Sequence, residues 1–108
     1  MGTATVDLDI NEGDTFIMAL ELWADQDNTQ PIDITNDTFT GSFQIGTKNI
    51  PMTITVLDPT INAIEARVDH NSMKDLSSKG RYEIDQLTNG DSFRLIQGNV
   101  RVSQEVNL

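Results

Sequence analysis

Short runs of alternating apolar and polar residues cover most of the chain. A period of two places alternate side chains on opposite faces of a β-strand, so each run predicts a strand with one buried face. Turns rich in Gly, Pro, Asn and Asp separate the runs, among them Asp58-Pro59-Thr60. The predicted strands cover residues 5–10, 15–23, 38–45, 50–56, 61–68, 81–87 and 92–102, with a shorter extended segment at 31–35.

A β-hairpin is predicted where the last two runs meet at Asn89-Gly90. Both residues accept the positive φ angles of a type I′ turn, which suits the twist of paired strands. Gly98 interrupts the second strand and predicts a β-bulge there, and the hairpin is expected to include an edge of its sheet. The alternation places these side chains mostly on the core-facing side: Tyr82, Ile84, Phe93, Leu95, Val100 and Val102.

Residues 15–23 differ from the other runs because they are apolar on both faces. Phe16 begins the even-numbered face, while Ile17 and Trp23 lie on the odd-numbered one. This pattern predicts a central strand, covered by the core on one side and by a neighbour or a partner chain on the other. A helix over residues 18–24 is the alternative.

Residues 70–77 are predicted to contain one short helical turn, with Met73 and Leu76 pointing inward, and to cross from one sheet to the other. Seven or eight short strands, without alternating long helices, predict an all-β protein. The expected architecture is an antiparallel β-sandwich of immunoglobulin-like type, in which residues 1–108 form a single domain.

Charge narrows the classes of partner. The chain has 17 acidic and 7 basic residues, which give a net charge of −10. Affinity for nucleic acid and for anionic membrane surfaces comes mainly from Lys and Arg, so neither is expected as a partner. The acids are scattered, which favours a solvated surface, and the alternatives are a basic partner subunit or bound cations.

The chain has no cysteine, which excludes disulfides, thiolate metal sites and a cysteine nucleophile. Residues 1–7 lack a basic region followed by an apolar stretch, so no signal peptide is expected. The longest apolar-leaning segment, residues 16–23, is far shorter than the roughly 20 residues of a membrane helix. No membrane interaction is therefore predicted.

The polar segment after residue 24 contains a candidate metal site. Asp25, Asp27 and Asp33 fall on alternate positions of the segment, where the start of a calcium loop places its oxygen ligands. Gln30 stands where that loop requires Gly, and Asn36 stands where a bidentate Glu should close the site. A solvated loop is therefore preferred to a weak cation site, and no cofactor is predicted.

Catalytic chemistry is not predicted. His70 is the only histidine, and its neighbours Asp69 and Ser72 imitate the components of a catalytic triad. Triad geometry arises when separated segments converge, which residues this close in sequence rarely achieve. His70 is therefore interpreted as a corner or cap residue, and the protein is not expected to be an enzyme.

Trp23 is either an edge residue of the core or an interface anchor, since Trp concentrates binding energy at protein contacts. The other candidate interface residues are Ile17 in the same run, with Phe93 and Arg94 in the closing hairpin. A carbohydrate- or receptor-binding module that uses Trp23 and the loop 25–33 is an alternative.

Four short motifs occur in a recognisable order along residues 12–106: Gly13-Asp14-Thr15-Phe16, Pro31-Ile32-Asp33-Ile34-Thr35, Gly80-Arg81-Tyr82 and Gly98-Asn99-Val100-Arg101-Val102. Together they resemble small β-sandwich modules of tailed-phage virions, of which the N-terminal domain of lactococcal-phage baseplate upper proteins is the best-known example. The chain departs from that pattern at Asn36, where Gly is usual, and at Glu83-Ile84-Asp85, which replaces a strand that more commonly contains an aromatic residue.

The resemblance implies a non-enzymatic virion structural protein that docks onto other virion subunits around the tail, baseplate or neck. Such a protein is assembled in the host cytoplasm and carries no catalytic residues. Capsid decoration on the outer head shell is the alternative within the same class. The oligomeric state is left open, and a homo-oligomer is one possibility.

Overall fold

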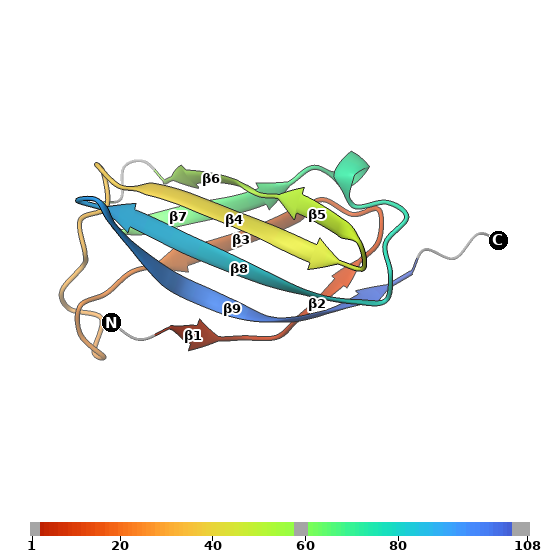
Figure 1. The fold of residues 1–108 in the computed structure, drawn as a ribbon. Helices are drawn as coiled ribbons and strands as arrows, with labels where there is room; N and C mark the ends of the chain where they lie inside the picture. Colours follow the sequence, from red (N-terminus) through yellow and green to blue (C-terminus); the bar gives the residue numbers. More distant parts are fainter. Residues whose placement is uncertain (1–2, 58–60, 105–108) are drawn as a thin grey trace.

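The computed structural model describes residues 3–57 and 61–104, which form strands and one 3-10 turn (Figure 1). The predicted turn at residues 58–60 lies outside the described residues. The elements are β1 (Ala4–Thr5), β2 (Leu8–Asn11), β3 (Phe16–Glu21), β4 (Thr38–Ile45), β5 (Lys48–Pro51), β6 (Thr53–Val56), β7 (Ala63–Val68), η1 (His70–Ser72), β8 (Lys79–Thr88) and β9 (Asp91–Ser103).

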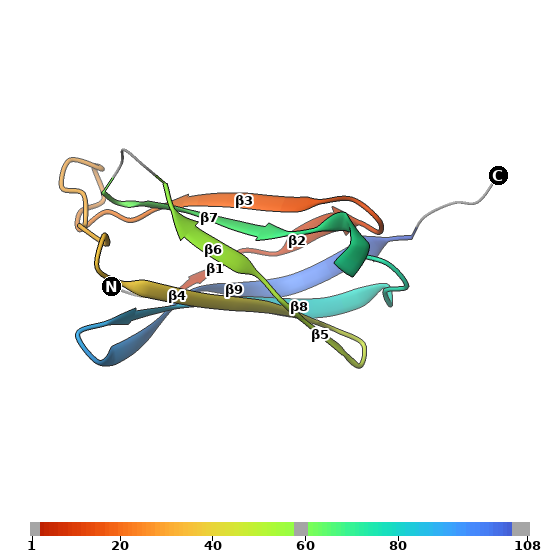
Figure 2. The same cartoon turned by 90° about the horizontal axis from the view of Figure 1, so that it is seen from above.

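Two sheets pack face to face, which confirms the predicted all-β sandwich (Figure 2). The larger sheet has the order β1-β9-β8-β4-β5, with β2 also paired to β9, and the smaller sheet has the order β3-β7-β6. Two pairings depart from the antiparallel expectation, because β1 and β2 both run parallel to β9.

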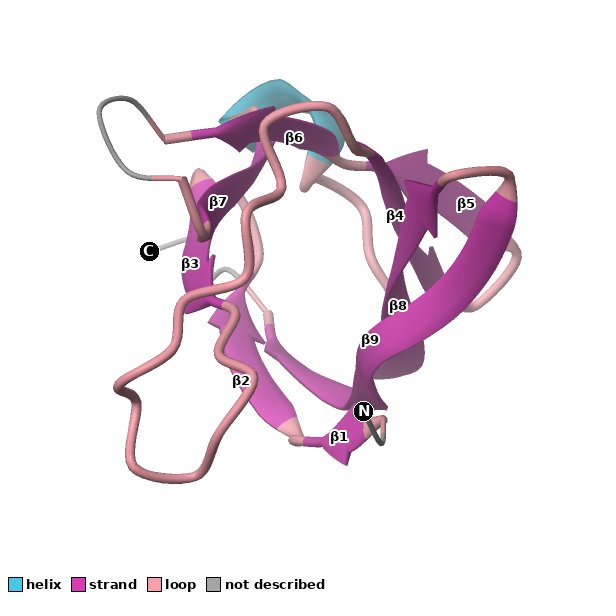
Figure 3. Ribbon diagram, turned by 90° about the vertical axis from the view of Figure 1, so that its left-hand side faces the viewer, coloured by secondary structure: helices cyan, strands magenta, loops and turns pink. Residues whose placement is uncertain are grey.

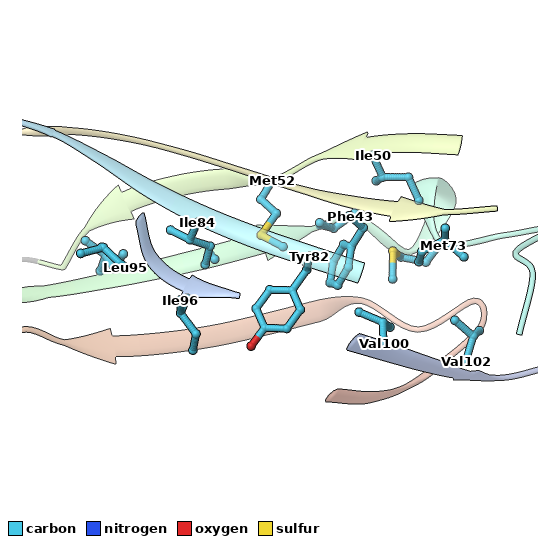
Figure 4. Close-up of a cluster of buried hydrophobic side chains, with 14 of the residues drawn as sticks. Phe43, Ile50, Met52, Met73, Tyr82, Ile84, Leu95, Ile96, Val100 and Val102 are labelled. Atoms are coloured by element: carbon cyan, nitrogen blue, oxygen red, sulfur yellow. The ribbon is translucent and has the colours of Figure 1, made fainter. Parts of the chain in front are cut away.

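The core lies between the sheets and is built from the inward side chains of β4, β7, β8 and β9. Phe43 is fully buried and meets the ring of Phe16 edge to face, with 4.8 Å between ring centroids. Figure 4 shows Phe43, Met52 and Tyr82 projecting into the same interior space. Tyr82, Ile84, Leu95 and Val100 are all buried, which confirms the predicted inward face of the hairpin.

The closing hairpin has the predicted turn, in which Asn89 and Gly90 have φ angles of 51° and 84°. The predicted bulge at Gly98 is wrong. The register shifts instead at Leu95, because Ile84 pairs with Ile96 while Asp85 pairs with Arg94. The extra residue lets Leu95 and Ile96 both be buried, although they are adjacent in sequence.

Gly98 is required by a close backbone approach rather than by a bulge. A Cβ atom at this position would lie 2.1 Å from the carbonyl oxygen of Val6, which passes beside it between β1 and β2. The same parallel pairing places β9 inside the sheet from Ile96 onward. The expectation that the hairpin includes an edge therefore holds only for the segment of β9 before Ile96.

Three other predicted strands differ from the structure. The run 5–10 is divided between β1 and β2, with Val6 and Asp7 between them. Within residues 15–23, Phe16–Glu21 form β3, which is an edge strand and neither a central strand nor a helix, because its outer side has no strand partner among the described residues. The run 50–56 breaks at Met52 into β5 and β6, which belong to different sheets. Met52 donates its backbone N–H to the carbonyl of Gly41 at 2.8 Å as the chain crosses over.

The extended segment predicted at 31–35 contributes only a single bridge, between Pro31 and Trp23. The short helical turn predicted within residues 70–77 is present and covers His70–Ser72, although its N-cap has no side-chain hydrogen bond. Met73 and Leu76 are nevertheless buried, as the sequence predicts.

Candidate interaction surfaces

The loop between β3 and β4 and the tip of the β8–β9 hairpin lie at the same end of the sandwich (Figure 1). Between them is a hollow of about 260 Å³, here named the end hollow. Phe93 lies opposite Gln86 on the core-facing side of β9, yet the residue is 52% exposed. The residues lining the end hollow are Ile32, Asp33, Asp37, Gln86, Thr88, Phe93, Arg94 and Leu95.

Polar groups of the end hollow are fixed by local hydrogen bonds. Gln86 is buried, and its Nε2 donates to Oδ2 of Asp37 at 2.7 Å. Asp33 accepts hydrogen bonds from the backbone N–H of Thr35 at 3.0 Å and from its hydroxyl at 2.8 Å. These bonds favour the charged carboxylate and lower the pKa of Asp33. The hollow therefore combines an exposed aromatic ring with an acidic rim.

Arg94 contributes to the wall of the end hollow, but its guanidinium group is engaged by acids of β8. One terminal nitrogen lies 2.7 Å from Glu83, and Nε lies 3.0 Å from Asp85. The hydrogen bond to Asp85, with the charges of Asp85 and Glu83, raises the pKa of Arg94. Such exposed pairs contribute about 0–1 kcal/mol, so Arg94 supports the strand pairing more than it offers a free charge.

Trp23 lines a second hollow of about 280 Å³, here named the Trp23 hollow. The indole is partly buried, so Trp23 lies at the edge of the core and also faces an open hollow. Leu95, the bulge residue of β9, lines both hollows. The other lining residues are Ala4, Leu20, Glu21, Leu22, Asp25, Asn28 and Ile96.

Asp25 organises the loop beside Trp23. Its carboxylate accepts hydrogen bonds from the backbone N–H of Thr29 at 3.0 Å and of Gln30 at 2.9 Å, and from the hydroxyl of Thr29. These donors, with the Thr29 hydroxyl first, lower the pKa of Asp25. The carboxylate thus closes the loop on itself, as Asp commonly does in turns.

The three acids of the candidate calcium loop are not brought together. Asp25 borders the Trp23 hollow, Asp33 borders the end hollow, and Asp27 is exposed on the loop that joins them. Within residues 3–57 and 61–104, no group of three or more His, Cys, Asp or Glu side chains could hold a metal ion.

Ile17 is separate from the end hollow. It lies on the outer face of β3, opposite Arg67, with 54% of its surface exposed. Leu87 is a further exposed apolar residue that the sequence analysis missed. The sequence pattern could have indicated its exposure, because the outward positions of β8 are otherwise charged and Leu87 is the one apolar residue among them. These positions are Arg81, Glu83, Asp85 and Leu87.

His70 and Asp69 form an exposed pair, with 3.2 Å between Nδ1 of His70 and Oδ1 of Asp69. Ser72 donates its backbone N–H to the carbonyl of Asp69 at 3.0 Å, as part of the 3-10 turn. No hydrogen bond joins His70 to the hydroxyl of Ser72 in the described part of the chain. These three residues therefore lie at the chain corner where β7 ends and the 3-10 turn begins.

The sequence matches no protein-family model, and no curated protein is similar enough to count as a relative. No helix of the described residues is long and apolar enough to cross a membrane. The structure shows a two-sheet β-sandwich with partly open hollows on its surface.

Proposed function

We propose that the protein is a non-enzymatic structural component of a tailed-phage virion that docks onto other virion subunits around the tail, baseplate or neck. The observation that carries the docking role is the exposed ring of Phe93 at the end hollow. A half-exposed aromatic side chain beside an apolar hollow is the kind of anchor that concentrates binding energy at protein interfaces.

The assignment to a phage particle is supported by the motifs that resemble those of virion sandwich modules. In this fold the motif glycines occupy positions where the backbone conformation or the available space requires glycine. Gly13 has a φ angle of 84° in the turn before β3, and a Cβ atom at Gly80 would lie 2.5 Å from the carbonyl oxygen of Gln44. The Asp33 motif forms the local turn with Thr35 that lines the end hollow.

The test is the composition of purified phage particles that carry the gene. Quantitative mass spectrometry is expected to find the chain at a fixed ratio to the tail or baseplate proteins. Its absence from particles, with normal amounts in the infected-cell lysate, would contradict the proposal. A ratio of hundreds of copies per particle would instead identify capsid decoration, the alternative within the same class.

A carbohydrate- or receptor-binding module is the second candidate, favoured by the partly buried Trp23 on its own hollow. Aromatic side chains at the edge of a hollow commonly provide apolar contact area with a polar tip. Trp23 is the only tryptophan, so its fluorescence reports directly on this hollow. A glycan array without binding, together with unchanged fluorescence, would remove this candidate.

A further inference from the structure

The sandwich is incompletely closed along one side. The inward side chains Phe16, Met18 and Leu20 of β3 are only partly buried, whereas Ile64 and Ala66 on the adjacent β7 are completely buried. On β2, Leu8 and Ile10 are also only partly buried. Figure 3 shows β3 and β2 as facing edges of the two sheets. We name the line between β3 and β1–β2 the open seam.

Hollows mark both ends of the open seam. The Trp23 hollow lies between the end of β3 and β1, because Leu20 and Ala4 both line it. A second hollow of about 260 Å³ lies between the start of β3 and β2, where Phe16, Leu8 and Ile10 line it. An extended segment along β3 would pass over both hollows, with side chains alternately facing the core and solvent.

The outer edge of β3 also presents backbone groups. Leu22, directly after β3, donates its N–H to the carbonyl oxygen of Asn62 at 2.8 Å, so the backbone N–H of Leu22 points toward the β7 side. The backbone groups of successive residues point alternately toward and away from the partner strand of an antiparallel ladder, so the N–H and C=O groups of Ile17, Ala19 and Glu21 point away from β7. No hydrogen bond to them occurs within the described part of the chain. Such an edge is a template for a further strand.

Charge indicates which segment fits. Asp9, Asp14, Glu21 and Asp25 line the two hollows of the seam, and among the residues that the structure describes no Lys or Arg lines either of them. A second copy of this chain, with its net charge of −10, would bring the same acids together. Complementary charge favours a basic segment, because like charges that face each other at an interface are costly.

We propose that the open seam binds an extended basic segment of another protein as an additional β-strand beside β3. Backbone hydrogen bonds to Ile17, Ala19 and Glu21 hold the segment, its alternate apolar side chains enter the two hollows, and its Lys or Arg side chains face the acidic rim. This mode is β-augmentation. It deepens the docking function and rests on the chain being a protein-binding module, but it does not depend on where the partner resides.

The first test uses a synthetic peptide of about nine residues, long enough to span β3, in which Val and Lys alternate. We expect it to slow hydrogen exchange of the amides of Ile17, Ala19 and Glu21 by about tenfold or more, measured by NMR. The amides of Ile54 and Val56 are the internal control, since they face the outer edge of β6 in the same sheet. The fluorescence of Trp23 is expected to change in the same titration.

Two control peptides separate strand addition from general electrostatic attraction. One has the same composition with its Val residues consecutive, and the other alternates Val with Glu. Equal protection by either control would overturn the proposal, and so would failure of the alternating Val-Lys peptide to protect the three amides. Protection of the same amides in the free protein, together with a dimer by light scattering, would identify a second copy as the occupant and would also overturn it.

A charge-matched pair of variants locates the site on the protein. Glu21→Lys is expected to weaken peptide binding by about tenfold, because it places a positive charge at the seam. Asp91→Lys makes the same change in net charge at the start of β9, away from the seam, and is expected to bind like the unchanged protein. Equal weakening by both variants would contradict the assignment. Particle composition is measured separately, so a failure of peptide binding at the open seam can be distinguished from a failure of the virion assignment.

Discussion

The hydroxyl group of Tyr82 donates a hydrogen bond of 2.5 Å to the backbone carbonyl oxygen of Val6, which is 76 residues earlier in the chain. Tyr82 is 2% exposed and belongs to the central strand β8, whereas Val6 lies between the two short strands that pair with β9. The bond therefore ties the start of the chain across β9 to the interior of the larger sheet. The N–H of Val6 also donates to Gln97 of β9 at 2.9 Å.

Stability is expected to fall at alkaline pH because of Tyr82. Burial, followed by the charge of Asp7, raises the pKa of Tyr82 above its ordinary value of 10.0. As the pH rises above about 10, the unfolded chain loses the phenolic proton while the folded protein keeps it, so unfolding becomes easier. Tyr82 is the only tyrosine, so absorbance of the phenolate gives its titration directly.

The matched variant is Tyr82→Phe, which should lose about 1 kcal/mol at neutral pH with the hydrogen bond to Val6. Between about pH 9 and 12, the range in which a tyrosine titrates, the stability of this variant should decline less than that of the unchanged protein. Denaturant unfolding at several pH values measures both effects. A phenolic midpoint at or below 10.0 in the folded protein would be inconsistent with the buried hydroxyl.

Gly98→Ala is expected to destabilise the protein by about 2–4 kcal/mol, because its Cβ would meet the carbonyl of Val6 and force the backbone apart. The control is Gly90→Ala, where a Cβ would meet nothing within 4 Å and only the φ angle of 84° is unfavourable. That change should cost about 1–2 kcal/mol. Thermal or urea denaturation compares them, and an equal or smaller loss for Gly98→Ala would refute the close approach.

The two substitutions near Val6 should not be additive. Gly98→Ala displaces the carbonyl that Tyr82 uses, so the hydrogen bond is already weakened when Tyr82→Phe is added. The double variant should therefore lose less stability than the sum of the single variants, by about 0.5–1 kcal/mol. Additive losses in a double-mutant cycle would show that Val6 can accept the bond in its displaced position.

Local chemistry in the sequence predicts the closing hairpin and its turn correctly, because Asn89-Gly90 and the alternating residues act over short distances. The predicted bulge at Gly98 is wrong because glycine is required there by a contact distant in sequence, the approach of Val6. No residue next to Gly98 in the sequence reveals that contact. The alternation separates Ile17 from Phe16, and the structure places Ile17 on the outer face of β3, but an apolar residue at such a position cannot distinguish an edge strand from a central one.

The candidate surface was only partly predictable for the same reason. The sequence predicts Phe93 and Arg94 together as interface residues of the hairpin, whereas in the structure Phe93 faces the end hollow and Arg94 pairs with acids of β8. Asp33 reaches the same hollow from the loop between β3 and β4. The juxtaposition depends on how that loop folds against the hairpin, which the spacing of residues does not encode.

Phe93→Ser tests the end hollow as a docking surface. Because the ring is half exposed, the change should cost less than about 1 kcal/mol in stability, yet weaken binding to a virion partner about tenfold or more. Leu87→Ser is the matched control, since Leu87 is 49% exposed on the opposite face of the same hairpin. Incorporation of each variant into particles can be measured by mass spectrometry. Equal incorporation of both would show that Phe93 does not anchor the docking.

Calcium at millimolar concentration is expected to leave the melting temperature unchanged, because Asp25 and Asp33 are used in separate local turns. Melting in calcium and in a chelator measures this directly. A higher melting temperature in calcium would mean that the loop rearranges to bring the acids together.

The same two acids predict a loss of stability in acid. Their pKa values are lowered from 3.8 by the donors of Thr29 and Thr35, so the folded protein resists protonation more than the unfolded chain. The stabilisation is present above pH 3.8 and is lost as the pH falls through the lower folded values. Asp25→Asn, which keeps the shape without the charge, should reduce this acid-dependent loss. Identical pH profiles for Asp25→Asn and the unchanged protein would show that the charge on Asp25 does not stabilise the loop.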